Sequence, residues 1–295
     1  MAIITAKKKP IKVKENLGYK VFLVFNFLIM LFVVIVTLYP FLYLISQSFS
    51  SDQAIIKGEV GLIPDGFHIE TYKYVLKGEF LHYYKNTIIY TLVGTVLSLA
   101  FSSMLAYPMS KPEIKFNRFL TPFVIFTMYF GGTLISNYIL IVGLKLKNTV
   151  PAFILPMMIS TYYVILMKSF FQSLPKDLEE AGEIDGLSKF GVFIRIALPL
   201  SKPIMATMTL FYSVMYWNKW YNAFLYLSKK QWPVAYYLQT IIRGVGGSEG
   251  DSDATSVSAN IKSCAMVLTV LPIICVYPVI QKYYVQGMML GGVKE

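Results

Sequence analysis

The chain has 295 residues and a net charge of +11, and 56% of its residues are hydrophobic whereas only 15% are charged. A soluble domain usually carries about a quarter charged residues, so the composition argues against one. The apolar residues fall in runs long enough for membrane helices, which need roughly 20 residues, and short alternating strands are absent. Basic residues cluster at the ends of these runs, where topology and anionic lipid account for them without nucleic-acid binding. We therefore expect an all-α protein that crosses a membrane several times.

Six apolar segments are candidate transmembrane helices, at residues 19–46, 83–107, 119–142, 151–171, 203–225 and 261–283. The basic stretch from Lys7 to Lys14 resembles the start of a signal peptide, but the apolar run after it is too long and no small-residue cleavage site follows. We therefore expect residues 1–18 to be a basic cytoplasmic N-terminus and residues 19–46 to be a retained first helix. Six helices then place both termini in the cytoplasm, and the basic residues are biased toward that side.

Motifs for covalent chemistry are absent from the sequence. It has no phosphate-binding loop of the Gly-x4-Gly-Lys-Ser/Thr type, no zinc-protease motif and no nucleophile elbow. Cys264 and Cys275 lie about 16 Å apart along one predicted helix, too far for a disulfide, and we interpret them as packing residues. We expect no enzyme activity, no bound cofactor and no metal site.

Residues 173–200, between the fourth and fifth apolar segments, are predicted to form two short helices with a bend. Pro175 suits a first helical position, and acidic residues follow in the first turns, where the helix dipole favours negative charge. Gly186 can adopt the left-handed conformation that ends a helix, and Ser188 can cap the next one. Pro199 and Pro203 would end that helix before the fifth segment. Its apolar face would contain Phe190, Phe193, Ile194 and Ala197.

Such an amphipathic pair has two possible roles: it lies on the membrane surface, or it inserts as a knob into a groove of another protein. The residue pattern favours the second. Glu180-Ala181-Gly182, three further residues, Gly186, nine further residues and Ile196-Ala197-Leu198-Pro199 resemble the EAA motif of permease subunits of binding-protein-dependent ABC importers. Gly182 departs from the second alanine of that motif, but both residues are small.

The resemblance extends over nearly the whole chain. The glycine-rich stretch at residues 282–294 resembles the C-terminal tail of the carbohydrate-importing, maltose-type branch, as do Leu38-Tyr39-Pro40 and Ile63-Pro64. Within that branch the chain is most similar to complex-oligosaccharide permeases. The resemblance implies a type I importer permease fold in the bacterial cytoplasmic membrane. It also implies a permease domain at residues 75–284, with coupling helices at 173–200, and a cytoplasmic tail at 285–295.

The resemblance further implies partners. A second, homologous permease would form the other half of the translocation path in the surrounding lipid, and an extracytoplasmic solute-binding protein would deliver the sugar. Two ATPase subunits would bind on the cytoplasmic side and use ATP and Mg²⁺. The first cytoplasmic helix would dock in an ATPase cleft through Glu180, Ala181, Gly182, Asp185 and Gly186. The residues that anchor the helix pair to the permease's own span would be Ile196, Leu198 and Pro199.

The stretch from Tyr216 to Asn222 is the leading candidate for the substrate path. Sugar sites need flat apolar faces on which a pyranose stacks and amides that bond its hydroxyls, and this stretch supplies both. If the fifth helix is continuous, Trp217 and Tyr221 share one face. The alternative is an interfacial belt of aromatic residues. The candidate path residues are Tyr216, Trp217, Asn218, Tyr221 and Asn222, with Tyr129 and Asn137 of the third segment as further candidates.

The rival interpretation is a secondary transporter driven by an ion gradient. Such proteins often have inverted repeats and ionisable residues at mid-membrane. Neither feature is found here. The sequence has no evident inverted repeat, and the charged residues avoid the middle of every apolar segment. An ABC importer permease therefore accounts for the sequence better, whereas the identity of the sugar and of the ATPase stays open.

Overall fold

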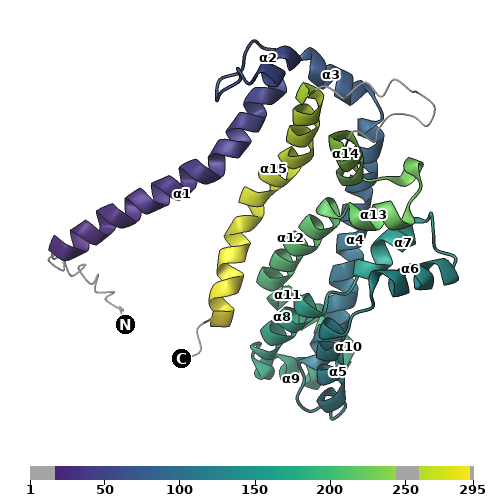
Figure 1. Cartoon of the computed structure of the whole chain (residues 1–295). Helices are drawn as coiled ribbons and strands as arrows, with labels where there is room; N and C mark the ends of the chain where they lie inside the picture. The colour runs from purple at the N-terminus through teal and green to yellow at the C-terminus, as the bar shows by residue number, and fades with distance from the viewer. Residues whose placement is uncertain (1–16, 244–258, 293–295) are drawn as a thin grey trace.

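The structure is a computed structural model that describes residues 17–243 and 259–292 (Figure 1). Within these residues the chain forms helices and connecting segments, with no β-strand. The predicted all-α fold is confirmed. The N-terminus predicted at residues 1–18 lies almost entirely outside the described residues.

The helices are described in chain order, first those up to residue 157 and then those after it. The first run contains α1 Leu17–Phe49, α2 Asp52–Lys57, α3 Glu70–Lys77, α4 Phe80–Met109, α5 Asn117–Tyr129, α6 Leu134–Gly143, α7 Val150–Ile154 and the 3-10 turn η1 Leu155–Met157. The second run contains α8 Thr161–Gln172, α9 Lys176–Ile184, α10 Lys189–Val192, the π turn η2 Phe193–Ala197, α11 Leu198–Leu200, α12 Lys202–Asn218, α13 Tyr221–Tyr226, the 3-10 turn η3 Lys229–Gln231, α14 Val234–Arg243 and α15 Ala259–Gly292.

Among the described residues, α1, α4 and α15 are each long and apolar enough to cross a membrane alone. Three bent pairs pass the same test: α5 with α6, α7 with α8, and the α10–α11 helix with α12. If each pair is one span, the described chain has up to six spans, in line with the six predicted segments. The two helices of each pair meet at an angle of 110°, 52° and 82°, respectively, so no pair forms one straight helix.

The continuous helix predicted at residues 119–142 is wrong. α5 ends at Tyr129 and α6 begins at Leu134, and two glycines lie in the segment between them. Thr133 caps α6, because its hydroxyl accepts a hydrogen bond from an amide of the first turn at 3.4 Å. Hydropathy is high on both sides of this break, so it does not reveal the bend.

The helix predicted at residues 203–225 is interrupted as well. α12 ends at Asn218 and α13 begins at Tyr221, and Lys219 between them leaves the helical conformation with φ −81° and ψ 84°. The start of the helix is as predicted. Pro203 lies in the first turn of α12, just after the 82° bend that separates α12 from the α10–α11 helix.

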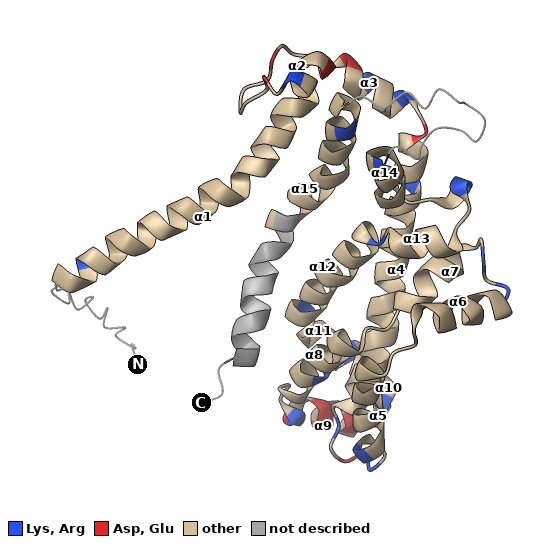
Figure 2. Cartoon of the chain, in the orientation of Figure 1, with Lys and Arg blue, Asp and Glu red and all other residues tan. Residues whose placement is uncertain are grey.

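Charged residues gather mainly at two ends of the helix bundle (Figure 2). One end carries α2 and α3 and is called the α3 end below, and the opposite end carries α9 and the start of α5 and is called the α9 end. α1 runs toward the α3 end, where its last turns contact α15, and the two helices diverge away from that end (Figure 1). No residue in the most apolar window of α1 is buried. This helix therefore presents its apolar surface to lipid or to another subunit.

The central helices α4 and α12 pack along a stripe of small residues on α4. A small residue recurs at every fourth position, a spacing that places all of them on one helix face. All of them are buried, so α12 approaches α4 closely, as small residues permit in membrane helices. The stripe consists of Gly94, Ser98, Ser102 and Ala106.

Two tyrosines of α12 reach across to this stripe. The Tyr212 hydroxyl is hydrogen-bonded to Ser102 at 2.6 Å, and the Tyr216 hydroxyl is hydrogen-bonded to Ser98 at 2.9 Å. Both tyrosines are at most 1% exposed. The hydrogen bonds therefore lie inside the helix contact and fix the register of α12 on α4.

Gly94 sets the separation of α4 and α12, because a Cβ atom there would lie 2.6–2.8 Å from ring carbons of the buried Tyr216. We expect Gly94→Ala to destabilise the protein by about 1–3 kcal/mol through overpacking, seen as a lower apparent melting temperature in detergent. Gly143→Ala in α6 is the matched control, because a Cβ there meets no atom within 4 Å. Equal melting temperatures for the two variants would contradict this account of the helix contact.

Candidate coupling site and substrate path

Residues 173–200, predicted to be the coupling helices, fold as a bent pair at the α9 end. Pro175 is the cap residue of α9, one position earlier than predicted, and two acidic residues lie in the first turn. Gly186 follows α9 with φ +85°, the left-handed conformation that glycine adopts without strain. The Ser188 hydroxyl accepts a hydrogen bond from the amide of Gly191 at 3.1 Å and caps α10. The predicted end of the first helix and start of the second are confirmed.

The second helix of the pair is not a regular α-helix. α10 passes into the π turn η2 before α11. A π turn holds an extra residue and rotates the side chains that follow it. The predicted apolar face is not buried as a unit: Phe193 and Ala197 are buried, whereas Phe190 and Ile194 are exposed. Phe193 packs on Tyr107 of α4, with ring centroids 4.9 Å apart.

Gly182 lies on the inner side of α9, against the second helix. It is buried, and a Cβ atom at this position would collide with Cδ1 of Ile196. The small residue therefore lets the two helices of the pair approach each other. Of the other two predicted anchors, Leu198 is half-buried against the core and Pro199 is exposed.

Glu179 fixes α9 to the end of α4. Its carboxylate forms an ion pair with Lys111 and accepts a hydrogen bond from the Tyr107 hydroxyl at 3.2 Å. The Glu179 and Lys111 side chains are only 13% and 15% exposed, so their attraction is screened less by water than that of a surface pair. Sequence reasoning missed this contact, which joins residues 68 positions apart.

A second ion pair joins Glu183 of α9 to Lys189 at the start of α10. The hydrogen bond to Glu183 raises the pKa of Lys189, which is charged at neutral pH with or without this effect. The Lys189 side chain is 78% exposed and that of Glu183 is 37% exposed. Pairs of this kind contribute little to stability.

The outward face of α9 carries the other residues predicted to dock on the ATPase. Glu180, Ala181 and Asp185 are exposed, as is Gly186 after the helix. Ile184, which was not predicted, is 86% exposed among them. An exposed apolar side chain on a helix can insert into an apolar groove of a partner protein. In the sequence, Ile184 could have been recognised as an isoleucine between two acidic residues, at positions 183 and 185.

Two of the predicted path residues are buried between helices. Tyr216 is 1% exposed on the small-residue stripe, and Trp217 is 7% exposed, with its indole N–H donating to the carbonyl of Thr269 at 3.1 Å. They hold α12 against α4 and α15 and do not face a path in this structure. Because α12 ends at Asn218, Trp217 and Tyr221 do not share a helix face, and that expectation is wrong.

The remaining candidate path residues are exposed or half-buried. α6 and α13 meet where Tyr138 stacks on Tyr226, with ring centroids 6.3 Å apart. Asn137 directly precedes Tyr138 and its amide donates to the carbonyl of Gly132 at 3.2 Å, and Asn222 lies one turn before Tyr226. No hydrogen bond among the described residues joins them to the other candidates, which are Asn218 at the end of α12, Tyr221 at the start of α13 and Tyr129 at the end of α5.

Comparison with known proteins assigns the chain to a family. Residues 98–290 match the family of inner membrane components of binding-protein-dependent transport systems. The chain belongs to this family. Two curated relatives come from Bacillus subtilis (strain 168). Protein LplC is 40% identical over 93% of this permease and 95% of its own length. The polygalacturonan/rhamnogalacturonan transport system permease protein YtcP is 35% identical over 92% of this permease and 97% of its own length.

A solved structure agrees with this assignment. It is that of a bacterial ABC transporter involved in the import of the acidic polysaccharide alginate. Its matching chain superimposes with a TM-score of 0.84 and 30% identity, over 92% of this permease and 99% of that chain. The fold of the permease is therefore that of an ABC importer subunit.

Family membership decides between the rival interpretations. Permeases of this family are membrane subunits of ABC importers without an ATPase site, so the chain is neither a secondary transporter nor an enzyme. It is a multi-pass protein of the bacterial inner membrane, and the family implies a complex with another permease, an ATPase and a binding protein. Among the described residues, no group of three His, Cys, Asp or Glu side chains is placed to hold a metal ion.

The Glu179–Lys111 pair provides a test of how α9 is held. Glu179→Gln should leave Lys111 largely buried without its counter-ion and lower the local stability of α9 by roughly 1–3 kcal/mol. Amide hydrogen exchange across Lys176–Ile184 should become faster. Glu183→Gln, in the exposed pair of the same helix, is the matched control and should change hydrogen exchange across α9 little. Equal exchange rates in the two variants would show that Glu179 does not hold the helix.

Proposed function

We propose that this permease forms half of the translocation path of an ATP-driven oligosaccharide importer and couples to the ATPase through α9. The observation that carries the proposal is the outward face of α9, where Ile184 projects among acidic residues from a helix held on α4. The names of similar proteins support the substrate class, since YtcP is named for polygalacturonan and rhamnogalacturonan and the solved transporter for alginate. Candidate substrates therefore include oligosaccharides of uronic acids as well as neutral ones.

The proposed topology places the α9 end in the cytoplasm. This end carries a cluster of basic residues around the start of α5, as the positive-inside rule requires of a cytoplasmic face (Figure 2). Six spans would then place residues 1–18 and 285–295 in the cytoplasm. The α3 end, with α2, α3 and η3, would face the solute-binding protein.

Movement of the ATPase subunits would be transmitted through α9 to helices α4 and α12. ATP and Mg²⁺ belong to the ATPase subunits, whose closure would displace α9. Glu179 joins α9 to α4, and the α10–α11 helix leads directly into α12. Because α4 and α12 are themselves tightly packed, they would move together and switch the path between inward-facing and outward-facing states.

The competing role for α9 is a helix that lies on the membrane surface. Ile184→Asp distinguishes the two roles, because a charge at an interface anchor should reduce co-purification of the ATPase about tenfold or more. The stability of the permease itself should not change, since Ile184 is 86% exposed. Ile63→Asp, at an isoleucine that is 81% exposed in the segment before α3, is the matched control. Normal ATPase recovery with Ile184→Asp would refute docking through this face.

The path is proposed to include the exposed amide of Asn218 and the half-buried amide of Asn222, on either side of the break between α12 and α13. Each amide would bond a sugar hydroxyl, so Asn218→Ala and Asn222→Ala should each raise the half-saturating sugar concentration about fivefold, for roughly 1 kcal/mol per hydrogen bond. The melting temperature should stay unchanged. Tyr216→Phe, which removes a buried hydroxyl from the α4 contact, should instead lower the melting temperature. Normal uptake by both asparagine variants would remove them from the path.

A further inference from the structure

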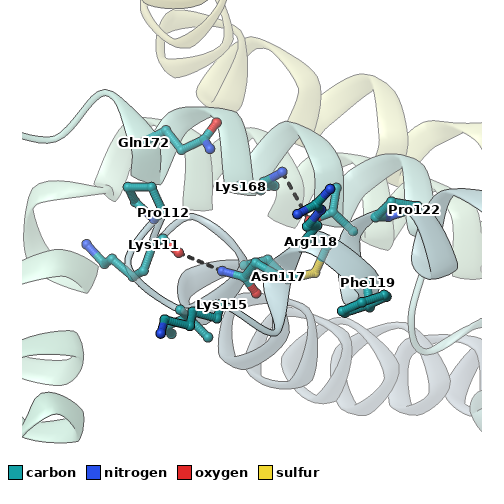
Figure 3. A pocket seen from close by; sticks show the side chains of 12 residues that line it. Lys111, Pro112, Lys115, Asn117, Arg118, Phe119, Pro122, Lys168 and Gln172 are labelled. Carbon is teal, nitrogen blue, oxygen red and sulfur yellow. Dashed lines mark hydrogen bonds between the residues drawn. The ribbon is translucent and has the colours of Figure 1, made fainter.

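A basic pocket opens at the α9 end, between the start of α5, the end of α8 and the segment that joins α4 to α5 (Figure 3). Its volume is about 750 Å³, which is large enough for a ligand of lipid-headgroup size. It is separate from the outward face of α9 and from every candidate path residue. Four basic side chains line it: Lys111, Lys115, Arg118 and Lys168.

Three of these four cations have no carboxylate partner within the described part of the chain. Lys111 is neutralised by Glu179, whereas Lys115, Arg118 and Lys168 form no ion pair there. The pocket therefore carries a net positive charge that the surrounding protein does not neutralise. Such a cluster destabilises itself by like-charge repulsion unless an anion is present.

Lys168 and Arg118 are held on the same side of the pocket. The Lys168 amino group bonds the Thr121 hydroxyl at 3.4 Å, and Arg118 lies one turn before Thr121 on α5. Figure 3 shows these two cations together, away from Lys111 and Lys115. A guanidinium and an ammonium that converge from two helices are a suitable pair for a phosphate group, whose geometry matches the guanidinium fork.

An apolar stripe leads from the pocket along α5. Phe119 lies beyond Arg118 at the rim and is 72% exposed (Figure 3). Phe123 and Phe126 are 64% and 53% exposed, and their spacing of four and three residues continues the same helix face. α5 belongs to a candidate membrane span, so this stripe runs from the charged end toward the hydrocarbon region. A soluble anion would use only the cations, whereas a lipid would use the cations and the stripe.

We propose that this pocket binds the phosphate of an anionic phospholipid. Arg118 and Lys168 contact the phosphate, Lys115 contributes long-range attraction, and the acyl chains lie along Phe119 and Phe123. Basic pockets between membrane helices at the cytoplasmic side suit such headgroups. The bound lipid joins α5 to α8 at the end of the molecule where α9 is held. The site does not depend on which sugar is carried.

The experiment measures lipid retained by the full-length permease in detergent, with phosphatidylglycerol and phosphatidylcholine supplied in equal amounts. Native mass spectrometry should show preferential retention of phosphatidylglycerol by the wild type. The double variant Arg118→Gln/Lys168→Gln should reduce that retention about tenfold or more. Lys20→Gln/Lys202→Gln removes two other exposed cations and should have little effect. The conservative variant Lys168→Arg should retain the lipid, which separates loss of charge from misfolding.

Three outcomes would overturn the proposal. Equal retention by the two double variants would show that the pocket is not the lipid site. If inorganic phosphate raises the melting temperature of the wild type and phosphatidylglycerol does not, the pocket binds a soluble anion. If the Arg118→Gln/Lys168→Gln variant keeps its lipid and loses the ATPase, the pocket is a protein contact. Loss of lipid with the ATPase retained supports the proposal.

Discussion

The close packing of α12 on α4 is the constraint on which the rest of the permease depends. Lipid does not drive helices together as water does, so close approach and hydrogen bonds must supply the association. The small residues of α4 permit the approach, and the hydroxyls of Tyr212 and Tyr216 reach serines of α4 at 2.6 and 2.9 Å. A larger residue in the stripe would separate the helices and weaken both hydrogen bonds at once.

Each end of this helix pair holds another segment of the chain in place. At the α3 end, Asn86 and Tyr90 donate hydrogen bonds to the carbonyls of residues 230–232, so the segment before α14 is fixed to α4. At the α9 end, Lys111 holds Glu179. The pair of helices therefore connects α9 to the segment before α14 at the opposite end of the molecule, as the proposed coupling needs.

Features that depend on neighbouring residues could be predicted, whereas features that depend on distant contacts could not. The left-handed Gly186 and the cap at Ser188 follow from local residue chemistry, and the number of apolar segments follows from hydropathy. The helix breaks at residues 130–133, 158–160 and 219–220 were missed because hydropathy reports composition and not direction. The burial of Tyr216 depends on its contact with Ser98, which lies 118 residues away in the sequence. The sequence alone does not distinguish an aromatic residue that packs on another helix from one that binds a sugar.

The structure separates the EAA-like segment into an inner and an outer set of residues. Gly182 accommodates Ile196, and Gly186 makes the turn between the two helices, so substitutions at these positions disturb the helix pair before any partner is involved. Glu180 and Ile184 are exposed and form no side-chain hydrogen bond or ion pair among the described residues, so both are accessible to the ATPase that we propose binds here. Loss of transport after a change at Gly182 or Gly186 is therefore no evidence of docking. Only the outer residues can separate docking from folding, because their side chains are exposed in the isolated subunit.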